Sequence, residues 1–205
     1  MKVLMINGSP RMNGNTSIAL DEMKKEFEKS DISVEIVQVG NKDVRGCIAC
    51  GKCSELGRCV FDDVVNELAK KFEEADGLVV ASPVYYASAN ATIIAVLDRL
   101  FYSSSFDKTM KVGASVVCAR RGGCSATFDE LNKYFTISNM PIASSQYWNS
   151  IHGRAQGEAD MDEEGKQTMR VLARNMAFLM KSIALGKEKY GLPETEKHAW
   201  THFIR

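Results

Sequence analysis

The sequence predicts an α/β fold with a five-stranded parallel sheet and helices on both of its faces. Short apolar runs alternate along the chain with segments of helical periodicity, and most runs end in glycine, serine, proline or asparagine. Strands that alternate with helices pair in parallel through right-handed crossovers. With 205 residues, 45% of them hydrophobic, the chain can bury one full core, so we expect a single domain over 1–205.

The elements of this fold can be assigned in order. We expect strands at 3–6, 32–39, 77–81, 110–118 and 141–147, and helices at 16–29, 64–75, 91–101, 125–134 and 164–183. Ile18, Met23 and Phe27 share one face of the first helix, as amphipathic packing requires. Pro83 should end the third strand, because proline cannot donate to the ladder. We expect a cysteine-rich loop at 46–60 and a C-terminal tail at 186–205.

The loop after the first strand has the features of a phosphate site. Backbone amides at the N-terminus of the helix that follows are free to bind an anion, and the helix dipole favours negative charge there. The loop lacks a Gly-Lys-Ser/Thr ending, which disfavours nucleoside triphosphates. It also lacks G-x-G-x-x-G, and the second strand ends in Gly40-Asn41 with no acidic residue to hold a ribose hydroxyl, which disfavours Rossmann dinucleotides. A monophosphate fits better, and the alternative is an ordinary capped turn. The candidate ligands are Ser9, Arg11, Asn13, Asn15, Thr16 and Ser17.

Two later loops should meet this one, since ligands of such sheets bind beyond the carboxyl ends of the strands. A flat heteroaromatic ring could lie on the aromatic loop formed by Pro83, Val84, Tyr85, Tyr86, Ala87 and Ser88. Backbone could approach its other edge at the glycine loop formed by Ala119, Arg120, Arg121, Gly122 and Gly123, where cations favour an anionic hydroquinone. A phosphate at one end and a planar ring at the other describe FMN. Alternatively, the tyrosines pack against core or another subunit and the arginines are solvated.

Four of the six cysteines lie together, in the spacing C-x2-C-x2-C-x5-C of Cys47, Cys50, Cys53 and Cys59. This crowding differs from a secreted disulfide framework, in which cysteines are spread along the chain. The spacing is close to that of bacterial ferredoxins and suits a cubane cluster. Zinc is the second candidate, because four thiolates suit its tetrahedral coordination. A third reading keeps the thiols free of metal, with an oxidised pair in purified protein.

Taken together, these motifs resemble a known family. Gly8-Ser9-Pro10-Arg11 with Gly14-Asn15-Thr16, and Ser82-Pro83-Val84-Tyr85-Tyr86, resemble the flavodoxin-like NAD(P)H-dependent FMN reductases, and the cysteines narrow the resemblance to the iron-sulfur flavoproteins. It implies a three-layer sandwich with strand order 2-1-3-4-5. It also implies that Ser9, Arg11, Asn15, Thr16 and Ser17 hold the FMN phosphate, that 83–88 and 119–123 frame the isoalloxazine, and that Cys47, Cys50, Cys53 and Cys59 ligate a [4Fe-4S] cluster. Members usually form dimers or tetramers, with flavins near subunit interfaces.

We therefore expect an FMN-dependent oxidoreductase that accepts electrons from NAD(P)H or a ferredoxin and passes them to a quinone, a nitro or azo compound, or a redox protein. Hydride transfer to the flavin needs no acid-base side chain, so no catalytic residue is assigned. The alternative is an electron-transfer flavoprotein served by protein partners without small-molecule turnover, and a third hypothesis is a regulatory module with an empty loop. The net charge of zero disfavours nucleic acid or membrane as a partner, and the N-terminus predicts a cytoplasmic protein.

A few residues remain ambiguous at this stage. The three histidines, His152, His198 and His202, form no cluster in the sequence and are assigned no chemistry. The loop that contains Arg154 follows the predicted fifth strand, where the arginine could meet a nicotinamide phosphate or remain solvated. Arg99 lies on a largely apolar helix, which indicates either a subunit contact or intrachain core.

Overall fold

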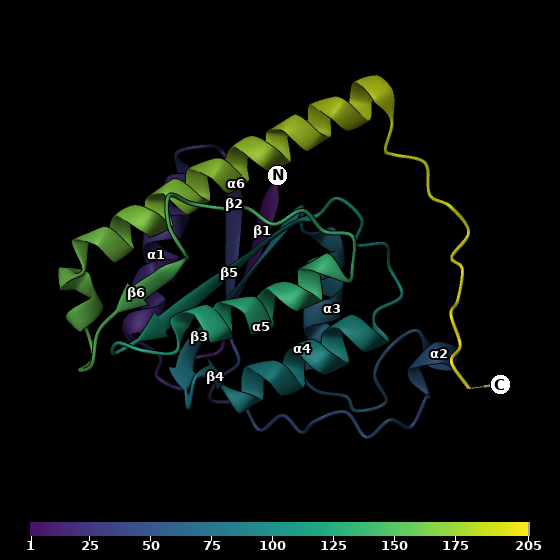
Figure 1. Cartoon of the computed structure of the whole chain (residues 1–205), viewed down its shortest axis with the longest axis horizontal. Helices are drawn as coiled ribbons and strands as arrows, with labels where there is room; N and C mark the ends of the chain where they lie inside the picture. Colours follow the sequence, from purple (N-terminus) through teal and green to yellow (C-terminus); the bar gives the residue numbers. More distant parts are fainter. Residues whose placement is uncertain (205) are drawn as a thin grey trace.

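The computed structural model describes residues 1–204 and has a six-stranded sheet at its centre (Figure 1). Its parallel strands are β1 (Lys2–Asn7), β2 (Ser33–Gln38), β3 (Gly77–Tyr85), β5 (Val112–Ala119) and β6 (Ser150–His152). They lie in the order β2-β1-β3-β5-β6, and the short β4 (Ser88–Ala89) pairs antiparallel with β3. The predicted parallel order, counted along the chain as 2-1-3-4-5, is confirmed.

Helices cover both faces of the sheet, which completes the predicted three layers. One face carries α1 (Asn15–Glu28) and α6 (Glu163–Tyr190), and the other carries α3 (Val64–Glu74), α4 (Ala91–Ser103) and α5 (Cys124–Thr136). The remaining elements are two short turns of helix, α2 (Cys53–Leu56) and η1 (Glu158–Met161). No helix within residues 1–204 has the length and apolar character that a membrane crossing requires.

The strands are apolar on both sides because each side meets a layer of helices. In β1, Val3 and Met5 belong to the core under α1 and α6, whereas Leu4 and Ile6 belong to the core under α3 and α4. All four side chains are fully buried. This explains why the strands read as continuous apolar runs rather than as an alternating pattern.

The fifth parallel strand differs from the prediction. Residues 141–147 contribute only an isolated bridge between Ile142 and Gly113, and β6 pairs with the end of β5 instead. The segment between Ile142 and β6 bends at 146–147, where the Ser145 hydroxyl donates to the carbonyl of Tyr147 at 2.6 Å. A serine that satisfies nearby backbone groups in this way competes with strand pairing.

Two other element ends also differ. β3 continues through Pro83 to Tyr85, whereas we expected proline to stop it. Its pairing with β1 ends at Ala81, while its pairing with β5 reaches Pro83, so the missing N–H falls where the strand has only one neighbour. At the other end of the chain α6 continues to Tyr190 rather than ending at Ile183, and an extended segment follows it (Figure 1).

Candidate functional site

The loop between β1 and α1 is fixed in place by the neighbouring strands. The N–H of Gly8 donates to the carbonyl of Ala81 in β3 at 2.8 Å, and the side chain of Gln38 in β2 donates to the carbonyl of Ser9. A Cβ at Gly40 would lie 2.1 Å from the Gly8 carbonyl oxygen, so only glycine permits this approach. The sheet therefore sets the position of the loop.

The N-terminus of α1 is open to an anion. Gly14 is the N-cap and makes no side-chain capping bond, and the first turn contains no acidic residue. Within residues 1–204 the N–H groups of Asn15 and Thr16 have no hydrogen-bond acceptor. Unpaired donors at the positive end of a helix dipole are the usual surroundings of a bound phosphate.

The predicted phosphate residues divide into two groups. Ser9, Arg11, Asn15 and Thr16 line one cleft, and Asn13 and Ser17 lie outside it. The Ser17 hydroxyl donates to the carbonyl of Met12 at 2.8 Å, so it braces the loop. The Asn15 amide is also used within the protein, because Nδ2 donates to the Ala155 carbonyl at 2.9 Å and Oδ1 accepts from the Ala159 N–H at 3.1 Å. Asn15 thus offers the cleft its backbone N–H.

The aromatic loop, 83–88, is a tight hairpin between β3 and β4. Its two turn residues, Tyr86 and Ala87, have φ angles of +51° and +61°, as a type I′ turn requires. Pro83, Val84 and Tyr85 line the cleft. Tyr86 projects fully into solvent at the tip.

The end of the hairpin is fastened to α5 and does not reach the cleft. The Ser88 hydroxyl donates to the Glu130 carboxylate at 2.9 Å, and the N–H of Ala89 donates to the same carboxylate at 2.8 Å. Of the six predicted residues in 83–88, only the first three therefore face the cleft.

The glycine loop, 119–123, meets the hairpin. Ala119 and Arg120 line the cleft, while Arg121 and Gly122 do not. Gly123 has a φ of +91°, and a Cβ at this position would lie 2.8 Å from Cγ1 of Val84. The two loops therefore pack together at Gly123. A larger residue is excluded there, both by the left-handed backbone angle and by the lack of space for a side chain.

The cleft also contains four residues outside the predicted ligand set: Gly14, Cys118, Gly153 and Arg154. The last two come directly after β6 at the carboxyl edge of the sheet, and the sequence had already placed their loop after its fifth strand. Arg154, which sequence left between a ligand and a solvated charge, lies in the cleft. Burial raises the pKa of the Cys118 thiol to about 12 despite an opposing hydrogen bond with Thr16, so Cys118 stays neutral.

The cysteine loop forms a second cavity. All four cysteines of the motif line it, together with Arg99 and Ser103 of α4. Cys59 is buried, and Cys47 and Cys50 are exposed. No three His, Cys, Asp or Glu side chains of residues 1–204 are grouped tightly enough to hold one metal ion. The thiols share a cavity but do not converge on a single point.

A buried arginine supports this cavity. Arg99 is 1% exposed, and its Nε donates to Sγ of Cys59 at 3.3 Å. Its two terminal nitrogens donate to the Asp63 carboxylate at 2.7 and 2.9 Å. Burial lowers the pKa of the guanidinium, and the hydrogen bonds to Asp63 and Cys59 raise it above its ordinary value. Arg99 thus belongs to the intrachain core, one of the two alternatives left by the sequence.

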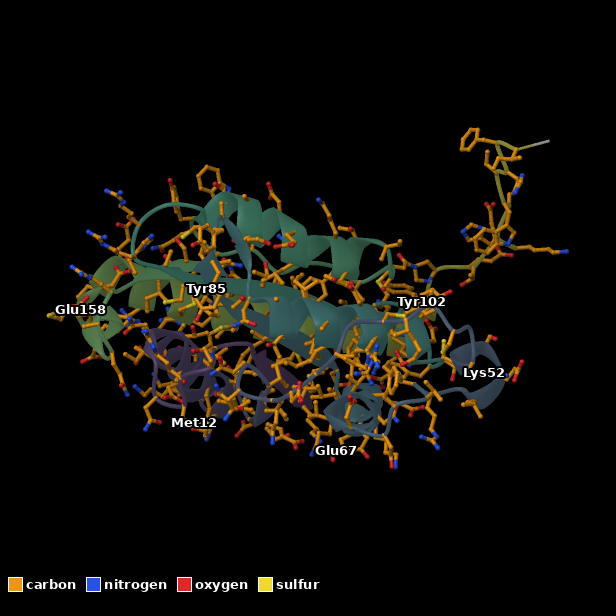
Figure 2. All side chains as sticks on the ribbon, turned by 90° about the horizontal axis from the view of Figure 1, so that it is seen from below. Met12, Lys52, Glu67, Tyr85, Tyr102 and Glu158 are labelled. Carbon is orange, nitrogen blue, oxygen red and sulfur yellow. The ribbon has the colours of Figure 1, made fainter. Side chains whose placement is uncertain are left out.

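The cleft and the cavity lie far apart within one chain. Figure 2 shows Tyr85 and Glu158 toward one end of the molecule, and Lys52 and Tyr102 toward the other. The helix α4 follows β4 at its N-terminus and places Arg99 and Ser103 in the cavity at its C-terminal end.

The parallel order β2-β1-β3-β5-β6, with a cleft beyond the carboxyl ends of β1, β3 and β5, defines a flavodoxin-like α/β protein. The fold is similar to that of RosB in a crystal structure with bound 8-demethyl-8-formylriboflavin-5'-phosphate, with a TM-score of 0.68 and 17% identity, over 100% of this chain and 94% of that one.

Comparison of sequences gives the family. The family of NADPH-dependent FMN reductases matches residues 1–154. An iron-sulfur flavoprotein of Methanocaldococcus jannaschii is 32% identical over 191 residues, which are 89% of this chain and 99% of the relative. An iron-sulfur flavoprotein of Methanosarcina thermophila is 30% identical over 92% of this chain and 100% of the relative. The chain belongs to the FMN reductase and iron-sulfur flavoprotein family, as the motifs predicted. This membership supports an FMN-dependent oxidoreductase.

Proposed function

We propose that the cleft binds FMN, with its phosphate at the N-terminus of α1 and its ring between the aromatic and glycine loops. One observation carries this proposal. Within residues 1–204 the backbone N–H groups of Asn15 and Thr16 have no hydrogen-bond acceptor, and both residues line the same cleft as Pro83–Tyr85 of the aromatic loop. The hydroxyl of Ser9 and the cation of Arg11 would complete the phosphate site. Bound FMN supplies hydride and single-electron chemistry. The protein's part is to anchor the phosphate and orient the ring.

The phosphate assignment can be tested by comparing FMN with riboflavin, which lacks the phosphate. The change Arg11→Gln removes a cation from the cleft and should weaken FMN binding by about fivefold, since a charge-assisted contact at an exposed site contributes about 1 kcal/mol. Riboflavin binding should not change. The control Arg121→Gln removes an exposed cation outside the cleft and should affect neither ligand. Equal weakening of both ligands by Arg11→Gln would contradict the proposed orientation.

We further propose that the cysteine loop holds a [4Fe-4S] cluster on Cys47, Cys50, Cys53 and Cys59. The donor set fits, because four thiols in a ferredoxin-like spacing line one cavity. The surroundings also fit a charged group. Arg99 directs an N–H at the Cys59 sulfur, and the buried Ser103 hydroxyl has no hydrogen-bond partner within residues 1–204. Such a cluster supplies one-electron transfer.

Iron and sulfide assays on anaerobically purified protein test the cluster. We expect about four irons and four sulfides per chain, the content of one cubane cluster. Both should be lost in Cys53→Ser. The matched control Cys118→Ser changes a cysteine of the other site and should keep the iron. Stoichiometric zinc without sulfide would instead establish the tetrahedral thiolate site.

For activity, we propose electron transfer from NAD(P)H or a ferredoxin to a quinone, a nitro or azo compound, or a redox protein. The cleft position of Arg154 supports a phosphorylated donor. Anaerobic mixing with NADH or NADPH should bleach the flavin absorption. If neither nucleotide does so, the reductase assignment fails and an electron-transfer flavoprotein, served only by protein partners, is the function that remains.

The remaining proposals concern the assembly and location of the protein. We propose a cytoplasmic homodimer or homotetramer with no nucleic-acid or membrane partner, on the basis of the clustered cysteines, the zero net charge and the family resemblance. The fully exposed Tyr86 at the hairpin tip supports a subunit contact near the cleft. Sedimentation of the FMN-loaded protein, compared with Tyr86→Ser, measures this association directly.

A further inference from the structure

The ends of three elements bring a thiol, an imidazole and a carboxylate close together. Cys124 is the first residue of α5, His152 is the last residue of β6, and Asp162 is the N-cap of α6. Sγ of Cys124 lies 3.7 Å from Nε2 of His152. Nδ1 of the same ring lies 3.4 Å from Oδ2 of Asp162. A nucleophile next to a base that a third group orients is the arrangement of nucleophilic catalysis.

The carboxylate is fixed by the backbone around it. Oδ1 of Asp162 accepts the N–H of Gly165 at 2.9 Å, and Oδ2 accepts the N–H of His152 at 2.7 Å. A Cβ at Gly165 would lie 2.5 Å from Oδ2, so a glycine is needed there. A carboxylate held beside Nδ1 favours the tautomer with its proton on Nδ1, which leaves Nε2 free to accept the proton of Cys124.

The thiol needs such a base. Burial raises the pKa of the half-buried Cys124 thiol, so alone it would remain protonated at neutral pH. Its place at the start of α5, with no acidic residue in the first turn, favours the thiolate once it forms. Other ionisable groups of this neighbourhood are Asp162, Glu164 and Tyr147, which line one cleft with His152, and Cys118, which is neutral.

The imidazole can exchange its proton with solvent. The His152 side chain is 43% exposed and lines a shallow cleft together with Tyr147 and Asp162. Water can therefore reach the ring.

We propose that Cys124 is a thiol nucleophile activated by His152, with Asp162 as a positioning residue, and that its substrate class is the low-molecular-weight disulfide. His152 Nε2 takes the thiol proton while Sγ attacks one sulfur of the disulfide. The bond from Sγ to that sulfur forms, the original S–S bond breaks, and the leaving thiolate takes the proton from Nε2. Cys124 is oxidised to a mixed disulfide, and half of the small disulfide is reduced to a free thiol. The site needs neither flavin nor cluster.

The test follows each cysteine separately by mass spectrometry of peptides after brief anaerobic exposure of the full FMN-loaded chain to 5,5'-dithiobis(2-nitrobenzoate). We expect Cys124 to be modified with a pH profile that changes when His152 is replaced. His152→Gln should slow its modification at pH 7 by at least about tenfold, and Asp162→Asn, which keeps an acceptor for the Gly165 N–H, by about threefold. Cys118 should remain unmodified as the internal control.

The result that would overturn the proposal is a Cys124 rate whose value at pH 7 and whose pH profile are both unchanged in His152→Gln. Flavin retention and the far-ultraviolet circular dichroism of each variant establish that it is folded. If Asp162→Asn unfolds the protein, the His152→Gln comparison and the pH profile still decide the outcome, because neither alters the N-cap of α6.

Discussion

Replacing Arg99 should reveal how strongly the cysteine cavity depends on one buried charge. In Arg99→Met a side chain of similar length keeps the packing, but the Asp63 carboxylate loses the two hydrogen bonds of 2.7 and 2.9 Å. Removing one partner of a buried ion pair costs about 3–5 kcal/mol. The Asp63 side chain is 27% exposed, so water offsets part of this loss and we expect the lower end, about 3 kcal/mol.

Urea unfolding of wild type and variants, followed by circular dichroism, measures this cost. The matched control Arg174→Met removes an arginine that is 57% exposed and pairs with Glu26 at 2.8 Å, and it should cost about 0.5 kcal/mol. In Arg99→Met with Asp63→Asn no charge is left unpaired, so the double variant should recover part of the loss. A cost for Arg99→Met no larger than that of the control would refute the reasoning.

Three further predictions follow from local geometry. Ala87→Gly relieves a left-handed backbone at the hairpin tip and should stabilise the protein by about 0.5 kcal/mol, measured as a higher Tm; a lower Tm would contradict this. Gly40→Ala should displace the loop between β1 and α1, since the alanine Cβ would lie 2.1 Å from the Gly8 carbonyl oxygen, and should reduce FMN retention on desalting. Hydrogen bonds from Lys71, and secondarily Lys2, lower the pKa of Glu35 below its ordinary 4.5, so their stabilisation is complete above pH 4.5 and is lost as the pH falls through the folded-state pKa. In Glu35→Gln the free energy of unfolding, measured with urea, should therefore fall less steeply as the pH is lowered below 4.5. An unchanged pH dependence would contradict the stabilising role of these hydrogen bonds.

The fold was predictable where a strand is buried and its sequence is therefore apolar. β1, β3 and β5 are buried on both faces, and the sequence marks each with a run made mostly of apolar and small residues. β6 has three residues, of which only Ile151 is buried, so it carries no such signal. The apolar start of 141–147 was mistaken for this strand. A short apolar segment that forms one bridge, at Ile142, looks the same in the sequence as the start of a strand.

The sequence predicted which loops form the candidate site, but not which way their side chains point. Position along the chain placed Ser9, Arg11 and Tyr85 in one cleft. It could not indicate that Ser88 turns to Glu130, or that Cys124 meets His152, because these contacts join segments whose separation is set by packing. A histidine with no neighbour in the sequence can still have a thiol and a carboxylate beside it in space.

The Asn15 side chain has a consequence for the order in which the protein becomes competent. Its amide spans 140 positions of the chain to reach Ala155 and 144 to reach Ala159. During synthesis the first loop leaves the ribosome early, but its brace exists only after residue 159 has emerged and β6 has joined the sheet edge. A nascent chain would therefore complete this loop late, when most of the sheet is already in place.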